Sequence, residues 1–241
     1  ELNVNEIAER LKIPTSSAAV HVKALEEADL IETRLMPGIR GSKKVCCKTM
    51  EHLNVALFSE EDLKQQAEVI KMPIGNYVDY KVVPTCGIVG ENGPIDEEDE
   101  PRCFYSPNRH EAQLLWFGKT GYVEYRFPNT ILMTERAKAL ELSAELCSET
   151  HEYDLNCKSD ITVWINGVEA GTWECPSDFG GRRGKRNPTW WPDKNTQYGK
   201  LKTWRITEKG SFLDGNLSNK ATIRDYHLEE KDYISVRIGV K

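Results

Sequence analysis

The sequence predicts an α+β protein of two domains: a small N-terminal domain with two helices and a β-hairpin, and a larger antiparallel β-sandwich. Two observations predict this division. Apolar residues recur at helical spacing near the N-terminus, whereas from about residue 112 short segments of strand character alternate with turns. We expect the boundaries at residues 1–57, 58–80 and 81–241, with a linker and dimerisation helix in the middle segment.

The composition fits a globular chain of 241 residues, with 39% hydrophobic and 29% charged residues. The apolar runs stay well below the roughly 18 to 20 residues that a membrane span needs, so we expect no membrane partner. The seven cysteines are an odd number and are scattered, which indicates reduced thiols and a cytoplasmic location.

The N-terminal segment predicts two helices joined by a tight turn. Residues 3–12 carry apolar side chains at helical spacing, and Pro14 disfavours helical geometry in the residue before it. Residues 17–28 form the second helix, with Thr15 or Ser16 as its N-cap. Two helices in this arrangement are typical of a helix-turn-helix.

A β-hairpin follows directly. Residues 30–36 and 43–50 have strand character, and residues 37–42 supply two glycines and a proline for the turn between them. Residues 31–50 hold five Lys and Arg against one Glu, although the whole chain has a net charge of -6. A basic hairpin after a helix-turn-helix is a wing, so we predict an N-terminal winged helix-turn-helix.

The second helix carries a family resemblance. His21–Ile31 reads HVKALEEADLI and resembles the H-L-K-x-L-x-E-A-G-L-V signature of the ArsR-like winged-helix repressors. Asp29 replaces the glycine of that signature and tolerates a left-handed backbone better than most residues. The resemblance covers about the first quarter of the chain and implies a DNA-binding transcription regulator. The family's first helix has no counterpart, so we expect a trimmed sequence or unordered first residues.

The resemblance also bears on metal binding. Metal-binding members of this family carry two cysteines in an E-L-C-V-C stretch before the recognition helix. Here the stretch reads ELNVN, and Asn3 and Asn5 are poor ligands for soft metals. We therefore expect neither a metal nor another cofactor.

The remaining cysteines leave a redox- or metal-responsive regulator open as an alternative. Cys46 and Cys47 are adjacent on a strand and point to opposite faces, so they are badly placed to chelate one ion. Cys147 and His151 have a C-x3-H spacing without a second clear pair, and Cys157 lies nearby in sequence. Buried structural thiols explain these residues more simply.

The predicted DNA contacts come from the second helix and the wing. Short hydroxyl side chains can hydrogen-bond to DNA phosphates and base edges, and small apolar side chains can pack on a thymine methyl group. Cationic side chains can pair with the phosphates of the DNA backbone. His21 either packs locally or contacts DNA. An alternative is that the winged helix binds protein. The predicted contacts to double-stranded DNA are Thr15, Ser16, Ser17, Ala19, Val20, His21, Lys23, Arg40, Lys43 and Lys44.

Residues 58–72 predict one more helix, with Ser59 as N-cap and acidic residues in the first turn. Leu63, Ala67 and Ile70 form a dimer seam or pack against the wing. Because operators are commonly two-fold symmetric, we expect a homodimer. Residues 84–111 are rich in Pro, Gly and acidic residues and are expected to be irregular.

The C-terminal part predicts about eight short strands. Asn166-Gly167 favours a type I′ hairpin turn. The run over residues 161–173 is similar to the V-x-x-N-G-x-x-x-G strand pair of galactose-binding-like jelly-rolls, so we expect a jelly-roll-like sandwich. The expected strands cover residues 113–117, 121–127, 137–147, 160–165, 169–174, 202–206, 221–223 and 233–240.

One long segment, residues 173–195, combines tryptophans, prolines and the basic run RRGKR. Flat rings with an N–H group suit a sugar ring, and guanidinium groups suit a carboxylate or phosphate on such a ligand. Alternatively, the tryptophans pin the loop onto the sandwich, or the basic loop contacts DNA. The predicted contacts to a small-molecule effector, a carbohydrate, are Trp173, Asp178, Arg182, Arg183, Trp190 and Trp191.

No catalytic motif stands out. There is no Ser-His-Asp signal, no phosphate-binding glycine loop and no H-E-x-x-H motif. We therefore expect a regulator rather than an enzyme, whose second domain senses a small molecule. The second alternative is a carbohydrate-binding protein that uses its winged helix for protein contacts.

Overall fold

The computed structural model describes residues 2–38, 41–49, 68–118, 120–131 and 137–241. The chain divides into two compact units, Glu1–Glu68 and Val69–Lys241. Residues 68–72, the described part of the helix expected over 58–72, contain no helical residue, so that expectation is wrong there. The rest of that segment, with Leu63 and Ala67, lies outside the described residues.

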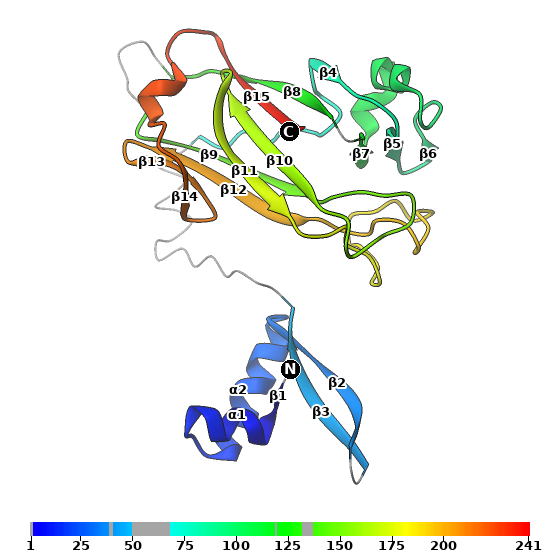
Figure 1. Cartoon of the computed structure of the whole chain (residues 1–241), viewed down its shortest axis with the longest axis vertical. Coiled ribbons are helices and arrows are strands. Elements are labelled where there is room, and N and C mark those ends of the chain that lie inside the picture. The colour runs from blue at the N-terminus through cyan, green and yellow to red at the C-terminus, as the bar shows by residue number, and fades with distance from the viewer. Residues whose placement is uncertain (1, 39–40, 50–67, 119, 132–136) are drawn as a thin grey trace. The chain divides into compact units, whose positions relative to one another are not determined.

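The described residues of the first unit form two helices and a three-stranded antiparallel sheet (Figure 1). The strands are arranged in the order β1-β3-β2, so that β3 is paired on both sides. The helix-turn-helix and the hairpin expected from the sequence are therefore confirmed. The elements are β1 (Leu2–Asn3), α1 (Val4–Leu11), α2 (Thr15–Glu27), β2 (Ile31–Gly38) and β3 (Gly41–Lys48).

Local interactions explain where these helices begin and end. The Asn3 side chain accepts a hydrogen bond from the Glu6 N–H at 2.9 Å, and the Glu6 carboxylate accepts one from the Asn3 N–H at 2.9 Å. This capping box starts α1. The backbone after α2 turns at Asp29 with φ of 57°, the left-handed conformation expected for it. The N-cap of α2 is Pro14 instead of the expected Thr15 or Ser16, because the helix begins at Thr15.

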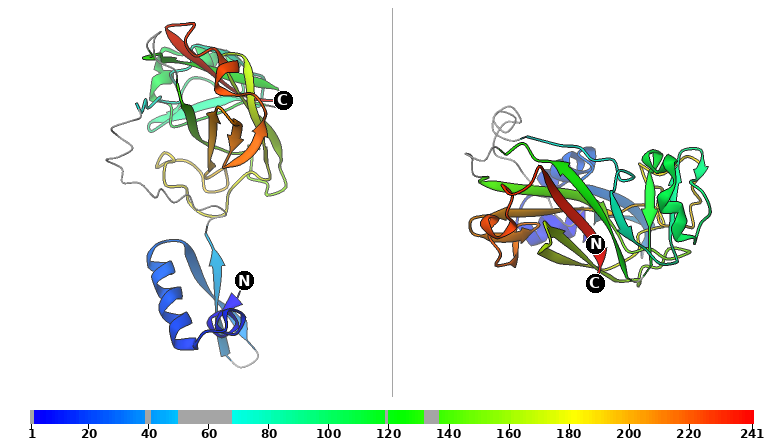
Figure 2. Two further views of the ribbon diagram at one scale, coloured as in Figure 1. Left: turned by 90° about the vertical axis from the view of Figure 1, so that its left-hand side faces the viewer. Right: turned by 90° about the horizontal axis from the view of Figure 1, so that it is seen from above.

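The second unit contains three antiparallel sheets (Figures 1 and 2). A five-stranded sheet has the order β11-β10-β15-β8-β4, a four-stranded sheet β14-β13-β12-β9, and a small sheet β6-β5-β7. The strands are β4 (Asp79–Lys81), β5 (Gly87–Gly90), β6 (Gly93–Pro94), β7 (Leu114–Trp116), β8 (Gly121–Pro128), β9 (Ala139–Leu146), β10 (Ser159–Ile165), β11 (Val168–Cys175), β12 (Lys200–Thr207), β13 (Gly210–Leu213), β14 (Asn216–Asn219) and β15 (Tyr233–Val240).

The two larger sheets share one hydrophobic core. Val163 and Val236 from the five-stranded sheet pack in the same cluster as Trp204 and Ile206 from the four-stranded sheet. The indole N–H of Trp204 also donates to the Gly171 carbonyl at 3.1 Å, which links the sheets by a hydrogen bond. The antiparallel sandwich is therefore observed, while the jelly-roll connection remains a prediction.

Three short 3-10 helices complete the unit: η1 (Pro101–Tyr105), η2 (Pro107–Glu111) and η3 (Ile223–Tyr226). Residues 84–111, expected to be irregular, thus contain η1, η2 and two short strands. The strand expected over 221–223 is wrong, because the Thr222 N–H and hydroxyl both donate to the Asp225 carboxylate and begin η3 instead.

Candidate nucleic-acid interface and ligand loop

The outward face of α2 is made of Ser16, Val20 and Lys23, which lie at i, i+4 and i+7 and are all exposed. On the opposite side Ala18 and Val22 are buried with 1% and 7% exposure. Val20, at the centre of this face, is an apolar side chain with 66% exposure and is free to contact a binding partner.

The other predicted contacts of α2 lie beside this face. Thr15, Ala19 and His21 are exposed, and Ser17 is half-buried. All seven predicted residues of the helix can therefore be reached from solvent to some degree. The three on the outward face are the ones that a DNA groove would meet together.

The wing strand β3 is tied to α2. Lys44 Nζ lies 3.3 Å from the Glu26 carboxylate, and the Thr33 hydroxyl of β2 donates to the same carboxylate. The Thr33 hydrogen bond, followed by the one from Lys44, lowers the pKa of Glu26 below its ordinary value. Arg40 lies outside the described residues, and only the backbone of Lys43 is described, as part of β3.

Two acidic residues of α2 were missed by the sequence reasoning. Glu26 connects the helix to the hairpin, as described above. Glu27 lies one turn beyond Lys23 and forms an ion pair with it at 3.7 Å. The i,i+4 spacing of Lys23 and Glu27 was a signal that could have revealed this pair.

Residues 1–32 match the family of winged helix-turn-helix DNA-binding domains. Neither the curated proteins nor the solved structures contain a match to the chain. The match spans β1, both helices and the start of β2, and it supports a DNA-binding regulator at this end of the chain. No helix within the described residues is long and apolar enough to cross a membrane.

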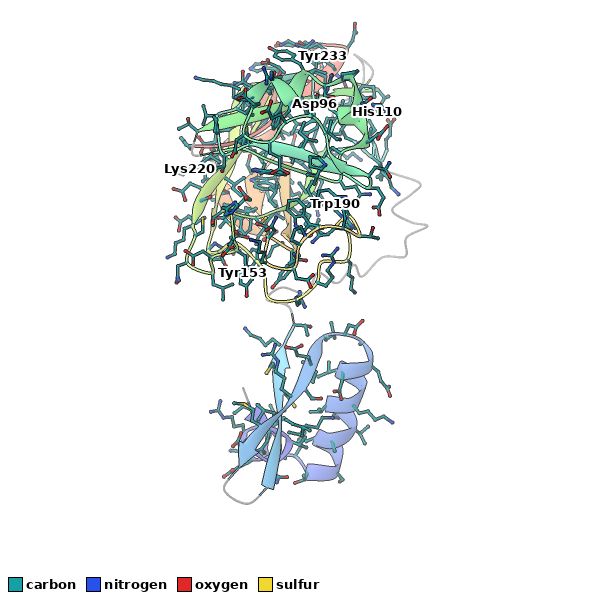
Figure 3. The ribbon with its side chains drawn as sticks, turned by 90° about the vertical axis from the view of Figure 1, so that its right-hand side faces the viewer. Asp96, His110, Tyr153, Trp190, Lys220 and Tyr233 are labelled. Atoms are coloured by element: carbon teal, nitrogen blue, oxygen red, sulfur yellow. The ribbon has the colours of Figure 1, made fainter. Side chains whose placement is uncertain are left out.

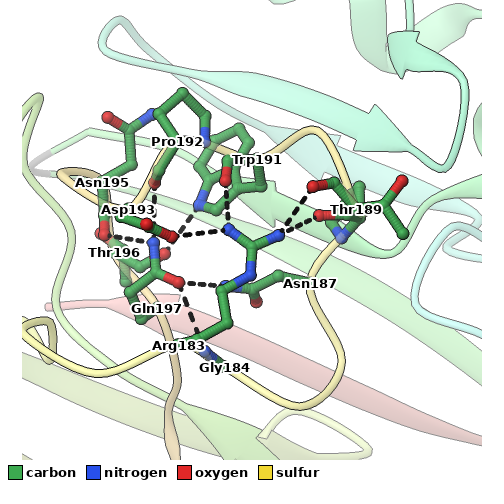
Figure 4. A network of polar contacts seen from close by, with 11 residues as sticks. Arg183, Gly184, Asn187, Thr189, Trp191, Pro192, Asp193, Asn195, Thr196 and Gln197 are labelled. Atoms are coloured by element: carbon green, nitrogen blue, oxygen red, sulfur yellow. Dashed lines mark hydrogen bonds and ion pairs between the residues drawn. The ribbon is translucent and has the colours of Figure 1, made fainter.

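The loop between β11 and β12 is organised around Arg183 (Figure 4). Its guanidinium donates to the carbonyl oxygens of Pro188 at 2.5 Å, Thr189 at 3.1 Å and Trp191, and pairs with the Asp193 carboxylate at 3.1 Å. All these acceptors belong to the same loop. Arg183, predicted to bind a ligand, is thus used to hold the loop together.

Gln197 is a second centre of this loop, and the sequence reasoning missed it (Figure 4). Its amide N–H groups donate to the carbonyls of Pro192 at 2.7 Å and Asn195 at 2.9 Å, and its amide oxygen accepts from Asn187 at 3.0 Å. A Cβ on Gly184 would lie 1.7 Å from the Gln197 carbonyl oxygen, so only glycine allows this approach. Residues 183–197 therefore form one hydrogen-bonded unit.

The two tryptophans of the loop differ in exposure. Trp191 is buried with 8% exposure, and its ring contacts Trp116 of β7 at a centroid distance of 5.8 Å. Trp190 is 38% exposed (Figure 3), packs edge-on against Trp191 and donates its indole N–H to the Gly90 carbonyl at 3.0 Å. Of the two rings, Trp190 is the one a ligand can reach.

Glu91 joins the small sheet to this loop. Its carboxylate accepts hydrogen bonds from Thr189 Oγ1 at 3.0 Å and from Gln113 Nε2 at 2.9 Å. The Gln113 hydrogen bond, then those of Thr189, lower the pKa of Glu91. A charged, hydrogen-bonded carboxylate therefore lies on the segment that also contacts Trp190.

Trp173 and Asp178 are placed where a ligand does not reach them directly. Trp173 is a core residue with 8% exposure, and Asp178 is fully buried. The Asp178 carboxylate accepts from the Thr150 N–H at 3.0 Å, and burial raises its pKa. Both residues stabilise the base of the loop.

Cations and rings form a column at the edge of the loop. Arg182 lies over the Tyr198 ring at 4.4 Å, Tyr198 stacks on Phe179 at 5.5 Å, and Lys200 lies over Phe179 at 5.0 Å. Arg182 is exposed and, among the described residues, has no hydrogen bond or ion pair. Of the six predicted ligand residues, Arg182, Arg183 and Trp190 are thus exposed, and Arg183 is already engaged by hydrogen bonds within the loop.

Three of the thiols considered as redox or metal-binding residues lie in environments that favour the neutral form. Burial raises the pKa of Cys147 and, less strongly, that of Cys157 and Cys46. A raised pKa reduces the thiolate fraction and hence the reactivity. Within the described ranges, no group of three or more His, Cys, Asp or Glu residues is placed to hold a metal ion.

Proposed function

We propose that the protein is a sequence-specific transcription regulator whose first unit binds DNA and whose second unit binds a small-molecule effector, a carbohydrate. The single observation that carries the DNA-binding half is the outward face of α2 with its exposed apolar Val20. Apolar side chains in a major groove contact thymine methyl groups, and the flanking hydroxyl and ammonium groups of Ser16 and Lys23 suit base edges and phosphates.

The carbohydrate half rests on Trp190 and its surroundings. The exposed indole of Trp190 lies on a hydrogen-bonded loop, and the Glu91 carboxylate lies close to the Gly90 carbonyl that holds the indole N–H. Aromatic faces suit the C–H surface of a sugar ring, and carboxylates accept from its hydroxyl groups. We propose no catalytic step. The effector would change the affinity for DNA only by the difference between its affinities for two arrangements of a homodimer.

The DNA-binding proposal is tested by a gel-shift titration with DNA from upstream of the protein's own gene. Val20→Glu places a carboxylate on the outward face and is expected to weaken binding by about 100-fold, or about 2.7 kcal/mol. Leu11→Glu is the matched control, because Leu11 of α1 is also apolar and 63% exposed. Equal affinities for both variants would show that α2 does not enter the groove.

A second experiment addresses the wing. Lys43→Ala combined with Lys44→Ala removes two cations, so the slope of log affinity against log salt should fall by about 2. An unchanged slope would show that β3 does not contact the DNA backbone.

The effector proposal is tested by a thermal-shift screen of neutral and acidic mono- and oligosaccharides. A saccharide that raises the Tm of the wild type should lose its effect on Trp190→Ala and retain it on Leu217→Ala, which truncates another exposed apolar side chain, on β14. If every saccharide leaves the wild type unchanged, or if Trp190→Ala responds normally, the carbohydrate assignment is wrong.

A further inference from the structure

The four basic residues of the run RRGKR at residues 182–186 differ in how they are used. Arg183 is engaged by hydrogen bonds to its own loop, although its side chain is 37% exposed. Arg182, Lys185 and Arg186 are exposed. Lys185 has no hydrogen bond or ion pair among the described residues, and the Arg186 pair with Glu145 is long, at 3.6 Å, with the Arg186 side chain 82% exposed. Three cations are therefore presented to solvent from one loop.

This loop is held in place before any partner arrives. The hydrogen bonds of Arg183 and Gln197 fix residues 183–197, so binding would not have to order the loop. The Arg182 guanidinium lies 4.4 Å from the centroid of the Tyr198 ring, a contact that restricts its position while the side chain stays exposed. Such an arrangement is suited to hydrogen-bonding phosphate oxygens.

The first unit has little positive charge of its own. Residues 1–68 hold nine Lys and Arg against twelve Asp and Glu, a net charge of −3. In addition, Lys23 pairs with Glu27 and Lys44 with Glu26. Because affinity for DNA depends largely on phosphate neutralisation, cationic contacts from outside this unit would add to its affinity.

We propose that Arg182, Lys185 and Arg186 form a second DNA contact, which binds the phosphate backbone of the duplex held by the winged helix. The three cations are exposed and lie on one loop, where they can contact phosphates of the same duplex. This inference rests on the proposed DNA binding of the first unit and adds a contact from the second unit.

The test uses the full chain and a fluorescently labelled random-sequence DNA duplex, since backbone contacts do not depend on sequence. Binding is measured by anisotropy between about 50 and about 200 mM salt. The triple variant Arg182→Gln, Lys185→Gln, Arg186→Gln should lower the salt slope by about 2 to 3 and weaken binding at least 10-fold. Lys185→Gln alone, which removes no contact within the protein, should lower the salt slope by about 1.

The control is a second triple variant with the same change in charge. Lys158→Gln, Lys209→Gln and Lys220→Gln remove three exposed lysines from other parts of the second unit (Lys220 is labelled in Figure 3), and the slope should stay at the wild-type value. Equal salt slopes for the two triple variants would show that the change follows from net charge alone, and would overturn the proposal. A wild-type slope in both loop variants would also overturn it.

The outcomes separate this inference from the proposed function. If the wild type does not bind the duplex at all, both fail. If Val20→Glu weakens binding to upstream DNA but the loop triple keeps the wild-type slope, only the second contact fails. If the loop triple keeps its slope and loses a thermal shift with an acidic saccharide, the loop belongs to the effector site and not to DNA.

Discussion

Glu26 of α2 and Lys44 of β3 form a 3.3 Å ion pair that joins the recognition helix to the wing. The hydroxyl of Thr33 donates to the same carboxylate, so helix and both hairpin strands meet at one acidic side chain. This pairing orients the two parts of the winged helix relative to each other.

The Glu26 contacts predict a pH dependence. Because its pKa in the folded protein is below the ordinary value of 4.5, the ionised carboxylate stabilises the first unit above that pH. The stabilisation is lost as pH falls through the lowered pKa. The Tm of Glu26→Gln should therefore lie below that of the wild type at pH 7 and approach it in acid. Circular dichroism at the helical band measures this, and a constant difference at all pH values would contradict it.

From Glu149 we expect the opposite pH dependence of stability in the second unit. Burial, then the charges of Asp178, Asp99 and Glu98, raise the pKa of Glu149 to about 7. Between pH 4.5 and about 7 the unfolded chain releases this proton while the folded chain keeps it, so stability falls as pH rises. Glu149→Gln should remove this fall and stabilise the protein by up to about 3 kcal/mol above pH 7.

The measurement for Glu149 is urea unfolding followed by tryptophan fluorescence at several pH values. All six tryptophans lie in residues 69–241, so the signal reports the second unit. Glu145→Gln is the control, because the Glu145 side chain is more exposed and its loss should leave the pH profile in place. Parallel profiles for wild type and Glu149→Gln would refute the assignment.

Replacing Arg183 should have a large effect on stability, although the residue lies in a loop. Arg183→Ala leaves three carbonyl groups and the Asp193 carboxylate without their donor, and should cost about 1 to 2 kcal/mol. Lys185→Ala, two residues away and without such bonds, should change stability by less than about 0.5 kcal/mol. Urea unfolding of both variants measures this difference. Equal losses of unfolding free energy would mean that the guanidinium does not hold the loop.

Lys202 and Asp214 form an ion pair of 2.8 Å whose side chains are only 6% and 11% exposed. Lys202 also lies over the Trp173 ring at 4.7 Å. Asp214→Ala leaves a buried ammonium without its partner and should cost about 3 to 5 kcal/mol. Replacing both residues, with Lys202→Met added, should recover a large part of that loss. A double variant no more stable than Asp214→Ala would show that burial of the charge is not the cause.

Local patterns made the winged helix and the hairpin at residues 166–167 predictable. Helical spacing and turn residues act over a few positions, and Asn166 and Gly167 indeed adopt φ angles of 48° and 86°. The strand expected over 233–240 is observed at those same residues. Short strands such as β13 and β14 were missed, because they depend on pairing with neighbours more than on their own sequence.

The candidate site was less predictable for a related reason. The sequence marks Arg182 and Arg183 as alike, yet one stacks on Tyr198 and the other donates to four groups of its loop. Which arginine turns inward depends on carbonyl groups that only the folded loop brings together. The importance of Gln197, a neutral residue without a motif, arises in the same way.

The position of β15 has a consequence for biosynthesis. This strand follows the other four strands of its sheet in sequence, yet it lies in the middle of the sheet, between β10 and β8. On a translating ribosome, β8 and β10 emerge first and keep one hydrogen-bonding edge open until β15 is made. Open edges of this kind invite association between nascent chains. The second unit should therefore acquire its native sheet only after residue 240 has been released, and a stalled ribosome would carry an aggregation-prone intermediate.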